Sequence, residues 1–253
     1  MNTKISKLMT ADVVSVVPST TLEQCAAVMD ERRISSLVVT ENGLPVGILT
    51  ERDMLSALSC RLLGSTMVGR VMGKPLVTVR EDVSYREAVR LFGEHSIRHL
   101  VVVGQGGELA GIVSETDLCR KGGIVELLGR RVVVDAMDQN PVLLPHDTEI
   151  AAAAMWMGRG RQSSVFVVTG AKPVGILTER DMVRQYRQGA AHDVLAERIM
   201  SAPVATILSD QSLTSAVQQM KSMNIRHLAV VDGAGEIVGQ LSENDILRGV
   251  SLS

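Results

Sequence analysis

The chain contains the ten-residue sequence PVGILTERDM twice, at residues 45–54 and again at residues 173–182. Related sequences stand between and after these copies: GILTERD begins at Gly47, GIVSETD at Gly111, GILTERD at Gly175 and GQLSEND at Gly239. The four glycines are evenly spaced by 64 residues. Four units of one length therefore account for nearly the whole chain, and its fold must be built from one small unit used four times.

Each unit has the same order of local signals. In the second unit, Ser84 and Glu87 have the spacing of a helix cap, and HLVVV at His99–Val103 is typical of a buried strand. In the first unit, Thr20 and Glu23 predict the same helix start. The predicted fold class is α/β (α+β), with the order β-α-β-β-α in every unit. The expected repeats are residues 1–58, 66–122, 132–186 and 196–250.

The units are expected to associate in pairs, because a unit of about 50–60 residues is too small to bury its own faces. Units one and three share PVGILTERDM, and units two and four share IRHL at Ile97–Leu100 and Ile225–Leu228. The chain is thus organised as one pair of units, one with two, followed by a second pair, three with four.

Composition excludes several classes of protein. The 253 residues are 45% hydrophobic but only 2% aromatic, and the net charge of −2 favours neither nucleic acid nor anionic lipid. No apolar run approaches the roughly 18 residues of a membrane helix, and no signal peptide is visible. The three cysteines, Cys25, Cys60 and Cys119, form no CxxC and predict buried, reduced thiols. We expect a cytoplasmic protein with no metal site, no membrane partner and no nucleic-acid partner.

A hydroxyl and an aspartate recur where the last strand of each unit meets its last helix. The pairs are Thr50/Asp53, Ser114/Asp117, Thr178/Asp181 and Ser242/Asp245. One interpretation is a helix N-cap, although a capping box normally uses the longer Glu or Gln. The other is a ligand site, because a helix N-terminus attracts phosphate and a carboxylate can accept ribose hydroxyls. The two roles are compatible. Arg52 and Arg180, inside TERD, are interpreted as solvated helix residues.

These motifs resemble CBS domains. The hydroxyl-x-x-Asp after a Gly-hydrophobic-hydrophobic strand, the IRHL strand and the paired units of about 60 residues all match that family. Two CBS repeats make a Bateman module, so the resemblance implies two modules. It also implies that adenosine-containing ligands bind in clefts between paired repeats and that occupancy is relayed to an effector, without catalysis.

The resemblance assigns roles to residues. It implies ribose contacts from Asp53, Asp117, Asp181 and Asp245, and ribose or phosphate contacts from Thr50, Ser114, Thr178 and Ser242. Phosphate contacts are implied for Arg98, His99, Arg226 and His227. Units one and three depart from this pattern, with Ser35 and Ser163 taken to stand where the histidine does. Val77 and Val204, placed on the first strand of their units, are candidates for the adenine pocket.

Two function classes follow. The first is a regulatory module, not an enzyme, that binds AMP, ADP or ATP, with S-adenosylmethionine and NAD as further candidates. We expect it to form a homodimer and to act on an unidentified effector. The second is an interaction scaffold with vestigial sites. A third alternative is the regulatory region of a larger signalling enzyme, such as a nucleotide cyclase or kinase.

Overall fold

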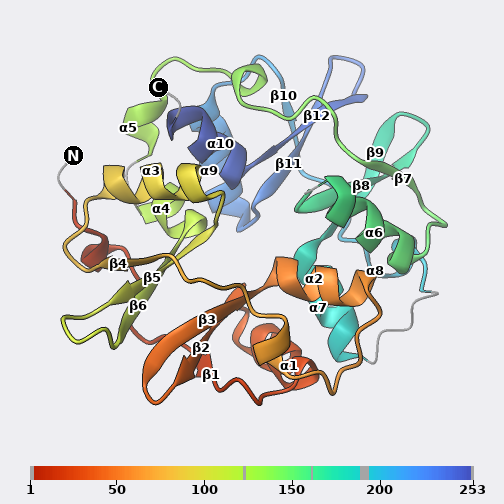
Figure 1. Ribbon diagram of the computed structural model, residues 1–253. Coiled ribbons are helices and arrows are strands. Elements are labelled where there is room, and N and C mark those ends of the chain that lie inside the picture. Colours follow the sequence, from red (N-terminus) through yellow and green to blue (C-terminus); the bar gives the residue numbers. More distant parts are fainter. Residues whose placement is uncertain (1–2, 122–123, 161, 189–193, 252–253) are drawn as a thin grey trace. The chain divides into compact units, whose positions relative to one another are not determined.

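The computed structural model describes residues 3–121, 124–160, 162–188 and 194–251 (Figure 1). The predicted repeat boundaries at residues 1 and 122 lie outside these ranges.

Every repeat forms a three-stranded sheet and two main helices. Repeat one comprises β1 (Ser15–Val16), α1 (Leu22–Arg32), β2 (Ser36–Glu41), β3 (Leu44–Thr50) and α2 (Glu51–Ser59). Repeat two comprises β4 (Thr78–Arg80), α3 (Tyr85–His95), β5 (His99–Val103), β6 (Leu109–Ser114) and α4 (Glu115–Lys121). Repeat three comprises β7 (Leu143–Pro145), α6 (Ile150–Gly160), β8 (Ser164–Thr169), β9 (Lys172–Thr178) and α7 (Glu179–Arg187). Repeat four comprises β10 (Thr206–Leu208), α9 (Leu213–Met223), β11 (His227–Val231), β12 (Ile237–Ser242) and α10 (Glu243–Ser251). Two further short α-helices are α5 (Val125–Leu128), which precedes repeat three, and α8 (Ala196–Ile199), which begins repeat four.

The strand order confirms the predicted β-α-β-β-α unit. In each sheet the first strand runs parallel to the second, and the second runs antiparallel to the third. A helix crosses between the two parallel strands, as a parallel connection requires. The apolar run of β5 forms a buried strand, as predicted, with Leu100, Val101 and Val102 almost fully buried.

The helices begin at the predicted cap residues, with one exception. Ser84 caps α3 by accepting the backbone N–H of Glu87 at 3.2 Å, as predicted. In repeat one, however, the cap is Thr21 with Gln24, and the predicted pair Thr20/Glu23 is wrong by one residue. The reason is local, because the N–H of Thr20 is used in a turn with the carbonyl of Val17 at 3.0 Å. The chain therefore enters the helix one residue later.

The chain divides into two compact units, which are described separately. Unit 1 is Met1–Val13, Val77–Pro141 and Ala205–Ser253, and unit 2 is Val14–Leu76 and Val142–Val204. The core of unit 1 draws on the helices of repeats two and four, including Tyr85, Phe92, Leu213 and Met220. The core of unit 2 draws on repeats one and three at the matching positions, Leu22, Met29, Ile150 and Met157. Each core is thus shared by two repeats that are not neighbours in sequence.

Neighbouring repeats are linked by an exchange of what we call leader segments, residues 5–13, 68–76, 133–141 and 196–204. The leader of repeat one belongs to unit 1, where Thr10 pairs with Ile112 of repeat two. In unit 2, the leader of repeat two pairs with repeat one through Gly73 and Ile48. Repeats three and four make the same exchange through Asp138/Gln240 and Ser201/Ile176. Within each unit, therefore, leader segments connect repeat one with repeat two and repeat three with repeat four. The shared cores that the sequence predicted for these pairs are formed instead by repeats one and three and by repeats two and four.

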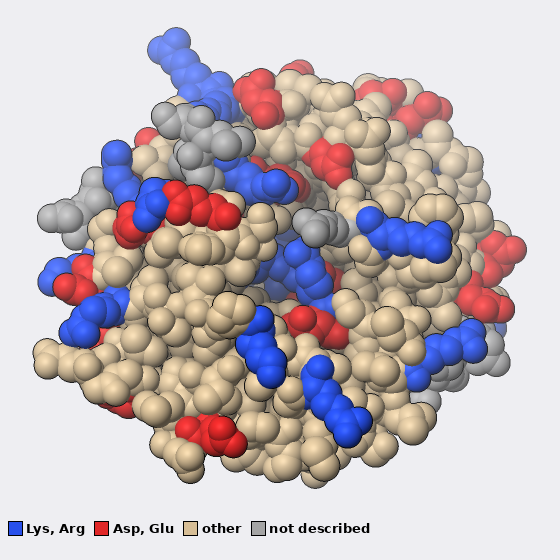
Figure 2. All heavy atoms as spheres, in the orientation of Figure 1, with Lys and Arg blue, Asp and Glu red and all other residues tan. Residues whose placement is uncertain are grey.

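Other surface features are simple. Both signs of charge are interspersed on the face shown in Figure 2.

Cys25 and Cys119 are buried free thiols, but Cys60 is exposed, which corrects the expectation that all three are buried. Cys60 terminates α2 and so lies past the end of its buried face. None of the helices in the described part of the chain has the length and hydropathy to span a membrane.

Candidate functional site

The recurring hydroxyl and aspartate form one local structure in all four repeats, which we call the corner. In repeat two, the backbone N–H and the hydroxyl of Ser114 both donate to Oδ2 of Asp117, at 2.9 and 2.6 Å. The N–H of Asp117 donates back to Ser114 Oγ at 3.2 Å. The same donors reach Oδ2 of the aspartate from Thr50 (2.7 and 2.6 Å), Thr178 (both 2.8 Å) and Ser242 (2.8 and 2.6 Å).

The N-cap interpretation is therefore confirmed, and one objection to it is removed. Aspartate was expected to be short for reaching back to the cap residue, yet all four reach its N–H within 2.7–2.9 Å. The cap residue is extended, with φ −120° and ψ 167° at Thr50, which turns its N–H toward the first turn of the helix. These cap bonds involve one carboxylate oxygen, and the cap does not require the other.

A leader segment passes beside every corner. Each leader pairs with the last strand of its neighbour two residues before the corner hydroxyl, as at Ile112 before Ser114. The glycine that precedes each corner at a fixed distance is also explained by the leader segment. A Cβ on Gly111 would lie 2.5 Å from Sδ of the leader residue Met9. The glycine at each corner thus makes room for a leader methionine, and the corner lies where two repeats meet.

The basic residues lie at the start of the middle strands, beside the corners. His99 is paired in register with Ser114, and His227 with Ser242. The same register pairs Ser36 with Thr50 and Ser164 with Thr178, so the residues matching the histidines are Ser36 and Ser164.

The sequence alignment that placed Ser35 and Ser163 opposite the histidines is therefore wrong by one residue. Those two serines instead match Arg98 and Arg226, because all four carbonyls accept the N–H of the first glutamate of the last helix. The error arose because the repeat spacing is not constant between corner and middle strand. Unit 1 has Arg-His at both of its corners, and unit 2 has Ser-Ser.

The adenine-pocket candidates lie before the first strands rather than on them. Val77 directly precedes β4 and packs, half-buried, against the core of unit 1. Val204 precedes β10 by two residues, and the residue that matches Val77 in repeat four is Ala205. Sequence reasoning placed this pair one position out of register, since aliphatic runs offer no internal landmark.

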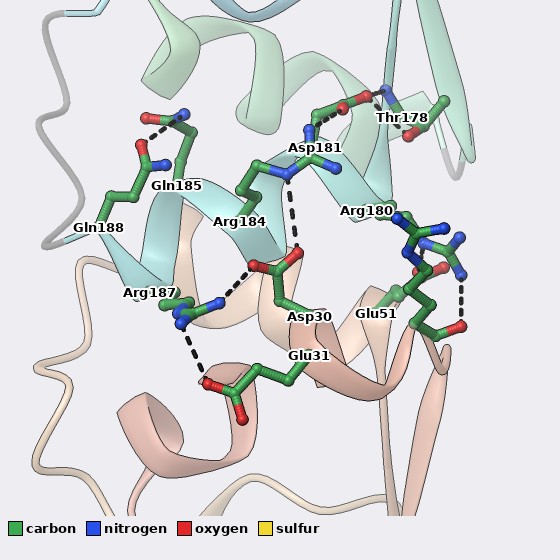
Figure 3. A network of polar contacts seen from close by, with 11 residues as sticks. Asp30, Glu31, Glu51, Thr178, Arg180, Asp181, Arg184, Gln185, Arg187 and Gln188 are labelled. Carbon is green, nitrogen blue, oxygen red and sulfur yellow. Dashed lines mark hydrogen bonds and ion pairs between the residues drawn. The ribbon is translucent and has the colours of Figure 1, made fainter. Parts of the chain in front are cut away.

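Glutamates next to the corner hydroxyls join the two repeats of each unit. In unit 2, buried Glu51 pairs with Arg180 at 3.1 Å, and buried Glu179 pairs with Arg52 at 3.4 Å. Figure 3 shows Glu51 and Arg180 beside a second set of contacts, in which Arg184 and Arg187 of α7 reach Asp30 of α1. Arg52 and Arg180 are partly solvated, as expected, but each also neutralises a buried carboxylate of the other repeat, which the sequence did not predict.

Unit 1 uses different partners for the same glutamate. Glu243 accepts hydrogen bonds from Thr116 Oγ1 at 2.6 Å and from Arg120 Nε at 2.9 Å, both in repeat two. Sequence reasoning assigned these glutamates to the helix dipole and missed the contacts between repeats. A signal was available, since glutamate follows the hydroxyl in all four repeats, at positions 51, 115, 179 and 243.

The aspartates of two corners have raised pKa values. Burial raises the pKa of Asp181 above the usual value of a carboxyl, although hydrogen bonds from Thr178 and the charge of Arg184 oppose the rise. Burial likewise raises the pKa of Asp245 against hydrogen bonds from Ser242. In both corners, desolvation of the carboxylate outweighs its cap bonds. Elsewhere, no group of three or more His, Cys, Asp or Glu among the described residues has a geometry that would hold a metal ion.

The comparisons with known proteins agree with this fold. The family model described as CBS domain matches residues 5–60, 68–122, 133–187 and 196–252. The chain therefore belongs to the CBS domain family, with four copies of the domain, and the resemblance drawn from its motifs is confirmed. CBS domains are generally regulatory, non-catalytic modules, and no catalytic family is indicated.

Some relatives match about half of the chain, and others match nearly all of it. CBS domain-containing protein YhcV of Bacillus subtilis is 34% identical over 115 residues, 45% of this chain and 81% of that protein. A crystal structure from Methanocaldococcus jannaschii, of a protein proposed as an archaeal homologue of γ-AMPK, has a TM-score of 0.87 at 22% identity. It covers 97% of this chain and 99% of that one, and so shares the whole fold. A Pyrobaculum aerophilum CBS domain protein complexed with AMP is 28% identical, with a TM-score of 0.44, covering 49% of this chain and 100% of that one. The chain spans only 62% and 56% of the length of two other curated relatives.

Proposed function

We propose that this chain is a regulatory module that binds adenosine-containing ligands at its corners. One observation carries the proposal: in all four repeats the cap hydrogen bonds converge on Oδ2 of the aspartate. The cap therefore leaves Oδ1 as the oxygen that can accept a ribose hydroxyl. Membership of the CBS family, whose usual activity is adenosyl-ligand binding, supports the same assignment.

The ribose is assigned to Asp53, Asp117, Asp181 and Asp245, each next to its corner hydroxyl. Phosphates are assigned to Arg98, His99, Arg226 and His227, which concentrates phosphate binding in unit 1. The ligand class is AMP, ADP or ATP. Binding would act by population shift, because a ligand moves an equilibrium only by its differential affinity for two states. We propose that a second copy of the chain and a separate effector protein bind differently to the two conformational states.

The test is a thermal-shift series with AMP, ADP, ATP, S-adenosylmethionine and NAD on ligand-free protein. A ligand at a hundred times its dissociation constant stabilises by about 2.7 kcal/mol, or roughly 5–10 °C for a chain of this size. The informative variant is the pair Asp117→Asn/Asp245→Asn. The asparagine oxygen can take the place of Oδ2 and keep the cap, while its amide group replaces Oδ1 with a donor. The shift should therefore fall while the stability of the free protein holds.

A matched control is Asp135→Asn. Asp135 also accepts a backbone N–H through Oδ2, from Val132 at 2.9 Å, but it belongs to a leader segment and not to a corner. It should leave the ligand shift unchanged. An equal loss of shift in both variants would mean that the effect is only structural.

A scaffold without ligands is the second candidate, and one observation favours it. The caps and the glutamate contacts between repeats account for TERD-like sequences without any ligand. A complete absence of thermal shift with all five ligands would favour this function. Light scattering tests the proposed homodimer, which is expected because like surfaces commonly associate about a twofold axis. A monomeric mass at micromolar concentration would exclude it.

A further inference from the structure

Lys121 occupies the carboxylate oxygen that the cap leaves over in repeat two. It is the last residue of α4, one turn beyond Asp117, and its Nζ lies 2.7 Å from Asp117 Oδ1. Because Ser114 takes Oδ2 with two hydrogen bonds, this ion pair uses the oxygen assigned above to ribose. A ribose hydroxyl that donates to Oδ1 shares this oxygen with the ammonium and weakens the ion pair.

The same ammonium reaches the leader segment of repeat one. Lys121 Nζ donates to the carbonyl oxygen of Leu8 at 3.3 Å. Leu8 directly precedes Met9, which packs on Gly111, and Thr10, which pairs with Ile112. When the ion pair with Asp117 opens, this carbonyl offers an acceptor but no negative charge. The ion pair between the lysine and Asp117 is therefore weaker when a ribose hydroxyl donates to Oδ1.

A lysine four residues beyond the corner aspartate is specific to repeat two, because the other repeats have Ala57, Gln185 and Gly249 there. Repeats three and four have an arginine one position earlier. Arg184 approaches Asp181 Oδ1 at 3.5 Å, with Asp30 as a second partner. Burial raises the pKa of Asp245, and the charge of Arg248 opposes that rise. The side chain of Lys121 is half exposed, so it is free to move to a new partner.

We infer that Lys121 makes the corner of repeat two selective for 5′-phosphorylated nucleosides over neutral ones. This inference rests on the proposed function. A neutral nucleoside competes with the ammonium for Asp117 and brings no anion of its own. A nucleotide carries its phosphate on the same ribose, within reach of a flexible lysine, and so offers the ammonium a second anion.

The experiment isolates this corner. Asp53→Asn, Asp181→Asn and Asp245→Asn together remove the ribose acceptors of the other three repeats and can keep their caps. In this background, calorimetric titrations with adenosine and with AMP measure the preference for the phosphorylated ligand. Lys121→Ala, which installs the residue that repeat one has at position 57, should bind adenosine about two- to fivefold tighter and AMP weaker by a similar factor. Lys121→Arg should keep the original preference.

Each outcome is decisive. An unchanged ratio of the two affinities, or a parallel loss of both, would overturn the inference, because general damage to the site moves both ligands together. If the background protein binds no AMP although the original chain does, repeat two is not a site and the inference fails while the proposed function stands. If the original chain binds neither ligand, the inference fails, and the proposed function fails as well when the thermal-shift series with all five ligands is also negative.

Discussion

Two tyrosine hydroxyls show how a single polar atom affects these cores. Tyr85 is the first residue of α3, where the other repeats have Leu22, Ile150 and Leu213. It is 1% exposed, and its hydroxyl lies buried without a hydrogen-bond partner among the residues that the structure describes. Burial also raises its pKa. Tyr186, in contrast, donates its hydroxyl to the carbonyl of Leu62 at 2.7 Å.

We predict that Tyr85→Phe leaves the free energy of unfolding unchanged or raises it by about 1 kcal/mol, because an unsatisfied buried hydroxyl is removed. The matched change Tyr186→Phe should lower it by about 1 kcal/mol, because a formed hydrogen bond is lost and the carbonyl of Leu62 is left without that donor. Urea denaturation of both variants measures the difference. A marked loss of stability in Tyr85→Phe would show that its hydroxyl is bonded in solution.

Residues whose role depends on a chemical group that recurs at a fixed spacing were predictable from the sequence. The corner aspartates were identified because a hydroxyl and an acid recur at fixed spacing, and the structure places each pair in hydrogen-bond contact. The role of Arg52 was not predictable, because its partner Glu179 is 127 residues away and an exposed helix arginine looks the same in sequence.

At the scale of elements, the contact between a leader segment and a strand depends on glycine. A Cβ on Gly175 would meet only the side chain of Met200, whose Cγ would lie 2.7 Å away. A Cβ on Gly239 would also meet backbone, the carbonyl oxygen of Asp138, at 2.9 Å. A methionine side chain can move, but a paired backbone cannot.

We predict that Gly175→Ala and Gly239→Ala each destabilise the protein by about 1–3 kcal/mol through overpacking. The cost of Gly175→Ala should largely disappear when Met200→Ala is already present. The cost of Gly239→Ala should persist in a Met137→Ala background, because the carbonyl of Asp138 remains in place. Double-mutant cycles in denaturant measure both.

Gly233→Ala is the control, because a Cβ there would meet nothing within 4 Å. It should change stability by less than about 0.5 kcal/mol. Equal losses at all three glycines would mean that the loss does not come from the contact with the leader segments.

Helices and strands followed the sequence closely, because hydrophobic periodicity and caps act over a few residues. The errors were shifts of one residue, at the cap of α1 and at the matching of Val204 and Ser163. In each case two adjacent residues had equivalent chemistry, such as Thr20 and Thr21, and only the backbone path chose between them.

At the scale of the whole molecule, charged pairs join repeats one and three within unit 2. Glu51 is 2% exposed and pairs with Arg180, which is partly solvated. The pair is intermediate between an exposed ion pair and a buried one. We predict a coupling energy of about 1 kcal/mol between Glu51→Gln and Arg180→Gln in a double-mutant cycle.

The comparison is the exposed pair of Arg90 and Glu94, one turn apart on α3. Its coupling should be smaller and should vanish in high salt, because solvent and ions screen it. The coupling of Glu51 and Arg180 should survive the same salt. Loss of both couplings in salt would mean that the contact between repeats one and three is as solvated as the surface.

The sequence by itself determined that one unit is used four times, which elements each unit contains and where the capped aspartates lie. These features depend on neighbours within about one helical turn. Only the tertiary structure decided that leader segments are exchanged, that repeat one shares a core with repeat three, and that Lys121 meets Asp117 Oδ1 and Leu8 together. These contacts join segments as far as 157 residues apart, as at Arg187 and Asp30. Four similar repeats offer several equivalent partners for every surface, so packing, and not local pattern, selects among them.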